Sequence, residues 1–75
     1  MAYRTFTDES GDEFRFYYFV NEDGDDVTRI EYKKLGQAEF SMIFEGILKY
    51  IAPEQFGQWL LLHRQWIKHR IQMGI

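Results

Sequence analysis

The segment from Phe14 to Val20 constrains the fold of this chain more than any other, because six of its seven residues are apolar or aromatic. Successive side chains of a strand point to opposite faces. One face of the predicted strand therefore carries Phe14, Phe16, Tyr18 and Val20. The other face carries Arg15, Tyr17 and Phe19. A strand that is apolar on both faces is typically central and covered on both sides, so we expect a second layer, or a partner, over each face.

The chain is short, with 75 residues and no cysteine. It predicts one domain, with neither disulfides nor a thiolate zinc site to stabilise it. A domain of this size buries only about 60% of the surface of its unfolded chain. Seven Phe, five Tyr and two Trp compensate with large apolar side chains. Self-association is a natural further source of stability for so small a core.

The first half of the chain reads as a β-meander. Strands are predicted at about 3–7, 13–20 and 26–33, from β-branched and aromatic residues and from alternation. The segments between them are rich in Asp, Ser and Gly, and Asp23-Gly24 is a strong hairpin signal. In the third strand, alternation places Val27, Arg29 and Glu31 on one face.

The second half predicts two helices, at about 37–51 and 53–73. Apolar residues recur at i, i+3, i+4, i+7, i+8 and i+11 in the first, at Phe40, Ile43, Phe44, Ile47, Leu48 and Ile51. Pro53 breaks this pattern and suits the first turn of the next helix. The predicted fold is therefore α+β: a three-stranded antiparallel meander followed by two α-helices packed on one sheet face, covering Phe14, Phe16, Tyr18 and Val20.

The second sheet face then becomes the main candidate for function. Tyr, Phe and Arg dominate the energetics of protein interfaces. The predicted partner-binding patch combines these residue types at Arg15, Tyr17, Phe19, Val27 and Arg29. Its partner is a second protein, or a second copy of the chain in a homodimer.

Charge is unevenly distributed along the chain, whose net charge is −3. Residues 1–31 hold nine of the twelve acidic side chains, and no acid follows Glu54. The predicted acidic surface comprises Asp8, Glu9, Asp12, Glu13, Glu22, Asp23, Asp25 and Asp26. These turns either keep the sheet soluble or offer a nucleic-acid-like surface to a basic partner. A basic helix face, formed by Arg64, Lys68 and His69, makes nucleic-acid binding an alternative.

A family resemblance adds another hypothesis. The segment Phe6-Thr7-Asp8-Glu9-Ser10-Gly11, two further strands, and Gln37-Ala38-Glu39-Phe40 opening a helix resemble the first part of ribonuclease H-like nucleases, over residues 3–51. The resemblance implies Asp8 and Glu39 as carboxylates that hold Mg²⁺ or Mn²⁺ for phosphodiester hydrolysis. The family takes further acidic ligands from a later strand and helix. This chain has no acid there, so the resemblance implies an incomplete relative.

These patterns favour a small non-enzymatic binding protein, a regulator or inhibitor of the kind that accessory or phage genes encode. We expect no cofactor and no small-molecule substrate, because neither a phosphate-binding glycine loop nor a nucleophile arrangement is present. We expect a cytoplasmic protein without membrane contact, because the start of the chain lacks a signal-peptide pattern and no apolar run reaches about 20 residues.

Overall fold

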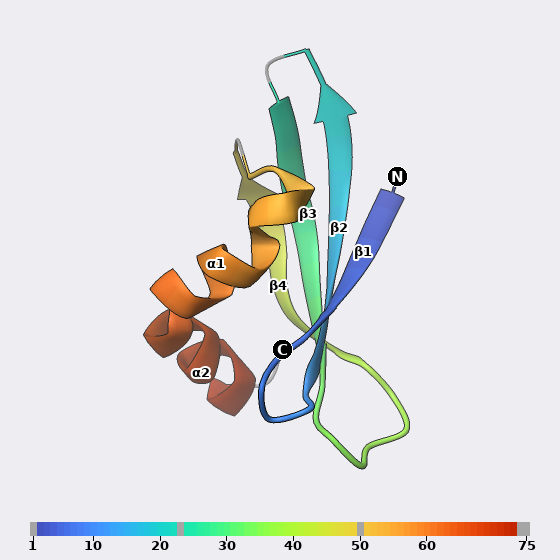
Figure 1. The fold of residues 1–75 in the computed structure, drawn as a ribbon, viewed down its shortest axis with the longest axis vertical. Coiled ribbons are helices and arrows are strands. Elements are labelled where there is room, and N and C mark those ends of the chain that lie inside the picture. Colours follow the sequence, from blue (N-terminus) through green and yellow to red (C-terminus); the bar gives the residue numbers. More distant parts are fainter. Residues whose placement is uncertain (1, 23, 50, 74–75) are drawn as a thin grey trace.

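The protein is an α+β fold in which an antiparallel sheet is packed against two short helices (Figure 1). A computed structural model describes residues 2–22, 24–49 and 51–73. The strands are β1 (Ala2–Thr7), β2 (Glu13–Asn21), β3 (Gly24–Lys33) and β4 (Ser41–Leu48). A 3₁₀ turn, η1 (Pro53–Gln55), leads into α1 (Phe56–Leu62) and α2 (Arg64–Met73). The sheet order is β1-β2-β3-β4, so each strand pairs with its neighbour in sequence and the predicted meander is confirmed for its first three strands.

The predicted helix at 37–51 is wrong, because residues Ser41–Leu48 form the fourth strand. Pairing between β3 and β4 is irregular at two places. Phe44 pairs with Ile30 and Met42 pairs with Glu31, which leaves Ile43 as an extra residue between them. Both Ile43 and Phe44 pack into the core as a result. This bulge replaces strict alternation by a pair of adjacent apolar residues, a spacing that resembles that of a helix.

The predicted helix at 53–73 is broken into three pieces. It begins as the 3₁₀ turn η1, and α1 ends at Leu62. His63 lies between α1 and α2 with φ −114° and ψ 27°, outside the helical range. Its N–H still donates to the carbonyl of Trp59 at 3.0 Å, and its own carbonyl accepts from Ile67 at 3.0 Å. The two helices therefore follow each other closely, and the chain changes direction between α1 and α2 (Figure 1).

The core lies between the helices and one face of the sheet (Figure 1). Phe16 is fully buried and stacks on Phe56 of α1 with ring centroids 4.4 Å apart, and Trp59 meets the same ring edge-on at 6.1 Å. Phe14 and Tyr18 also face this layer, as predicted. Val20 was expected there too, but it is 74% exposed. It lies near the β2–β3 turn, beyond the last residue of β2 that pairs with β1, Tyr18.

A second bulge changes the predicted faces of β3. Tyr17 pairs with Arg29 and Tyr18 pairs with Val27, so Thr28 is the extra residue. Its hydroxyl donates to the carbonyl of Tyr17 at 3.4 Å. One inserted residue reverses the alternation that follows it. Val27 is therefore 0% exposed and belongs to the core, and the prediction that it lines the partner-binding patch is wrong.

Candidate binding surface on the open sheet face

No described element covers the sheet face opposite the helices, which is called the open face from here on. Strand pairing and alternation assign to it Tyr3, Arg15, Tyr17, Phe19, Arg29, Glu31, Met42, Glu45 and Ile47. Tyr3, Phe19 and Ile47 are exposed large apolar residues. The structure thus places four of the five predicted patch residues on one face and adds neighbours from β1 and β4.

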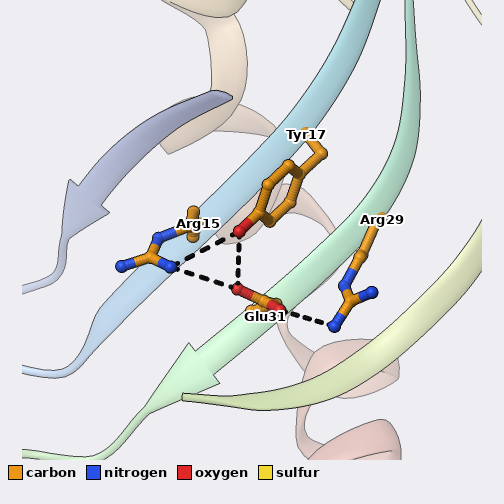
Figure 2. Close-up of polar contacts among 4 residues, drawn as sticks. All are labelled: Arg15, Tyr17, Arg29 and Glu31. Carbon is orange, nitrogen blue, oxygen red and sulfur yellow. Dashed lines mark hydrogen bonds and ion pairs between the residues drawn. The ribbon is translucent and has the colours of Figure 1, made fainter. Parts of the chain in front are cut away.

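An ion-pair network occupies the centre of the open face. Glu31 is only 9% exposed, although no described helix or strand lies over its face of the sheet. Its Oε2 lies 2.7 Å from Nη2 of Arg29, and its Oε1 lies 3.4 Å from Nη1 of Arg15. The hydroxyl of Tyr17 donates to the same Oε1 at 3.1 Å. Figure 2 shows the carboxylate between the two guanidinium groups, so both of its oxygens are engaged.

Aromatic rings pack against both guanidinium groups. Arg15 lies over Phe40, with its Cζ 4.0 Å from the ring centroid, and it also lies 5.1 Å from the ring of Tyr3. Arg29 lies 5.7 Å from the ring of Tyr17. Phe40 comes from the loop between β3 and β4, so that loop closes over one end of the network. Contacts of this kind each contribute roughly 0.5–1 kcal/mol where they are partly exposed.

Two of these contacts also favour the charged form of Arg15. The hydrogen bond with the Tyr17 hydroxyl raises the pKa of Arg15, and the Glu31 carboxylate adds to this while burial opposes it. Arg15 and Arg29 keep 29% and 42% of their side-chain surface exposed. Each guanidinium has five N–H donors, of which Glu31 and Tyr17 engage only some. The arrangement therefore presents two fixed, permanently charged donor groups beside exposed aromatic surface.

Beside the network lies a shallow hollow of about 530 Å³. Tyr17, Arg29 and Glu31 form one side of it, and Glu45 and Ile47 of β4 form the other. Gly46 belongs to the same lining. The hollow combines one apolar side chain with charges of both signs, which suits contact with protein side chains more than with an apolar ligand.

Much of the predicted acidic surface stabilises local structure. Oδ1 of Asp8 accepts the N–H groups of Ser10 and Asp12 at 2.9 and 3.0 Å, an arrangement that closes the β1–β2 turn. Asp12 accepts from the Tyr32 hydroxyl at 3.0 Å and from the N–H of Leu35 at 2.8 Å.

The other predicted acids lie at both ends of the sheet. Glu13 pairs with Lys33 at 3.5 Å. Glu9 and Glu22 are exposed, Asp25 and Asp26 are half-buried, and Asp23 lies outside the described residues. The two acidic turns are separated by the length of β2 and do not form one surface.

The predicted basic helix face meets one of these turns. Arg64, Lys68 and His69 are exposed on α2. Arg64 and Lys68 line a cleft of about 660 Å³, whose opposite wall contains Asp8, Glu9 and Asp12. Two surfaces that the sequence treats separately thus face each other across an apolar floor. Nucleic-acid binding through this helix stays a prediction.

The carboxylates implied by the ribonuclease H-like resemblance lie in loops. Asp8 is engaged in its turn, and Glu39 is exposed in the loop between β3 and β4. Within residues 2–22, 24–49 and 51–73, no group of three or more His, Cys, Asp or Glu side chains is arranged to hold a metal ion. The metal-binding role of this pair stays a prediction.

Glu31 lies at the centre of the network on the open face, but it was not among the predicted patch residues. Alternation correctly placed Glu31 on the same face as Arg29, but no ion pair was predicted for it. A usable signal was present, since Arg29 and Glu31 are two residues apart in one strand and Arg15 pairs with Glu31 in the meander. Opposite charges on one face of neighbouring strands form ion pairs.

Comparison with protein-family models, with curated proteins and with solved structures finds no match. In the described part of the chain, no helix has the length and apolar character needed to cross a membrane.

Proposed function

We propose that this chain is a small non-enzymatic binding protein that holds a protein partner on its open face. The observation that carries the proposal is the carboxylate of Glu31, buried between Arg15 and Arg29 on a sheet face that no described element covers. A network of this kind fixes the arginines before a partner arrives. Binding then costs less side-chain entropy than it would with mobile arginines.

The side chains of the open face indicate the chemistry of the partner that would bind there. Tyr3, Phe19 and Ile47 offer apolar contact, and the two guanidinium groups offer N–H donors at fixed positions. A protein surface with an apolar centre and a carboxylate beside it complements this arrangement. The regulator or inhibitor role is part of this proposal and rests on the same face.

Site-specific photo-crosslinking in the cells that make the protein tests the proposal. A benzophenone amino acid replaces Tyr3 or Phe19 on the open face, and Leu62 on α1 serves as the matched control, because it is 73% exposed on the helical side. We expect one discrete protein adduct from both open-face positions and none from Leu62. Arg29→Glu should reduce the adduct at least tenfold.

Two outcomes contradict the proposal. Equal capture at Leu62 would show that exposure alone produces the adducts. An adduct that disappears on nuclease treatment would assign the surface to nucleic acid instead.

A further inference from the structure

The two edge strands of the sheet, β1 and β4, differ in how far they are protected from pairing with another chain. At the β4 edge, pairing is irregular at two places, and Nε of Arg70 donates to the carbonyl of Ile43 at 2.6 Å. This bond ties the bulge of β4 to α2. Bulges and covering side chains are the usual means by which proteins prevent an edge strand from pairing with another chain.

The β1 edge has none of this protection among its described residues. Ala2–Thr7 pairs with β2 in unbroken register from Ala2–Tyr18 to Thr7–Glu13. Five of its six residues are exposed, and it contains neither proline nor glycine. Its single charge is Arg4. A regular and exposed edge strand can bind one further strand through its backbone N–H and C=O groups.

We propose that β1 pairs with β1 of a second copy of this chain, in antiparallel register about a two-fold axis, giving a continuous eight-stranded sheet. The surface concerned is the sheet edge, so the proposal does not depend on the function assigned to the open face, with which this edge shares Tyr3. A second copy is favoured over a foreign strand by the size of the protein, whose described core contains only nine buried apolar residues. Chains this small commonly gain stability by oligomerisation.

The sequence of β1 selects the register of this pairing. Residues that face each other in an antiparallel pair have side chains on the same side of the sheet. In a symmetric pair of β1 strands, one residue must therefore face its own copy, and the two-fold axis passes between these two copies. An axis at Arg4 would place the two arginines directly opposite each other, which is destabilising. An axis at Thr5 keeps nearly the whole strand paired. Arg4 then faces the partner's Phe6.

This register is also complementary in charge. Beyond the partner's Phe6 lie the partner's Asp8 and the partner's Glu9, in the acidic β1–β2 turn. An arginine side chain at this position is long enough to reach these carboxylates. It is exposed and makes no hydrogen bond or ion pair within the described chain, so it is available for this contact.

Because the sequence contains no cysteine, a single introduced cysteine can form a disulfide only with its own copy, so disulfide trapping tests the proposed register. In Thr5→Cys, the two new side chains lie beside the two-fold axis, with Cα atoms roughly 4.5–5.5 Å apart, within the separation that disulfides span. Thr7→Cys is the matched control, because it changes the same residue type on the same face of the same strand. In the proposed register, its two copies are more than about 13 Å apart.

We expect light scattering after size exclusion to give twice the mass of one chain. Mild oxidation should link Thr5→Cys at least tenfold faster than Thr7→Cys, and Arg4→Glu should weaken the dimer at least tenfold. A monomer at every concentration overturns the proposal. A dimer in which Thr5→Cys does not cross-link also overturns it. The proposal fails too if the double variant Tyr17→Glu, Phe19→Glu dissociates the dimer while Arg4→Glu leaves it intact, because the open face would then be the interface.

Discussion

At the scale of single residues, Glu31 shows how an apparently exposed position becomes structural. Alternation correctly places Arg15, Tyr17 and Arg29 on the open face, because β2 and β3 pair regularly as far as Tyr17 and Arg29. It fails for Val27, because the bulge at Thr28 leaves no mark in a sequence that is β-prone throughout. The burial of Glu31 depends in part on contacts with Arg15 and Tyr17 of the neighbouring strand β2, which the pattern of β3 alone does not contain.

Glu31→Gln should lower the free energy of unfolding by about 1–3 kcal/mol. The amide removes the negative charge between the two guanidinium groups and leaves them facing each other. Urea unfolding measures the change. Glu45→Gln is the matched control, because Glu45 is exposed on the same face opposite Arg29, and its effect should stay within about 0.5 kcal/mol. Equal losses in both variants would contradict the structural role of Glu31.

Tyr32 predicts a dependence of stability on pH. Burial raises its pKa from the ordinary 10.0 to about 12, and its hydrogen bond to Asp12 adds to the shift. The unfolded chain therefore loses the Tyr32 proton at a lower pH than the folded protein. The stability linked to this proton is complete below pH 10 and is lost as pH rises from about 10 to 12, by at most about 1.4 kcal/mol per pH unit.

Unfolding of the wild type and of Tyr32→Phe, compared from pH 8 to 12, isolates this contribution. All other ionisable groups are common to the two proteins, so only the difference between the two curves reports on Tyr32. We expect a constant difference up to about pH 10 and a relative loss in the wild type above it. Parallel curves across the whole range would contradict the shifted pKa.

At the scale of elements, the predicted strands lie within a few residues of β1, β2 and β3, whereas β4 was taken for a helix. Turn residues and alternation mark the first three strands clearly. In β4, the adjacent core residues Ile43 and Phe44 mimic a helical stripe. The break at His63 was also missed, since neither proline nor glycine marks it.

The contact between α1 and β1 yields a further prediction. A Cβ atom on Gly57 would lie 2.6 Å from Cε1 of Phe6, so the helix or the ring must move. Ala favours a helix over Gly by about 1 kcal/mol. Here, however, overpacking outweighs that gain, and Gly57→Ala should lower the free energy of unfolding by up to about 2 kcal/mol.

Thermal and urea unfolding should show this loss beside Gln58→Ala, an exposed neighbour in the same turn that should be neutral or stabilising. The penalty should also shrink in a Phe6→Leu background. A stabilising Gly57→Ala would show that α1 is not held against β1 in this way.

At the scale of the whole molecule, the sequence predicts the layers but not the arrangement of charge. The division into an acidic first half and a basic second half suggests two separate surfaces. In the structure, Arg64 and Lys68 face Asp8 and Glu9 across a cleft, because α2 returns to the β1–β2 turn. That return depends on the break at His63 and on a fourth strand, neither of which the sequence pattern revealed.

The bond between Arg70 and Ile43 also has a consequence for stoichiometry. Strand-to-strand association continues without limit when both edges of a sheet accept a neighbour, and the product is a fibre. Here the bulges of β4 and the bond from Arg70 of α2 to the carbonyl of Ile43 disturb one edge, so pairing of the proposed kind, through β1 alone, would stop at two chains. In that assembly, the arginine that fastens the helix to the sheet would also keep the number of chains finite.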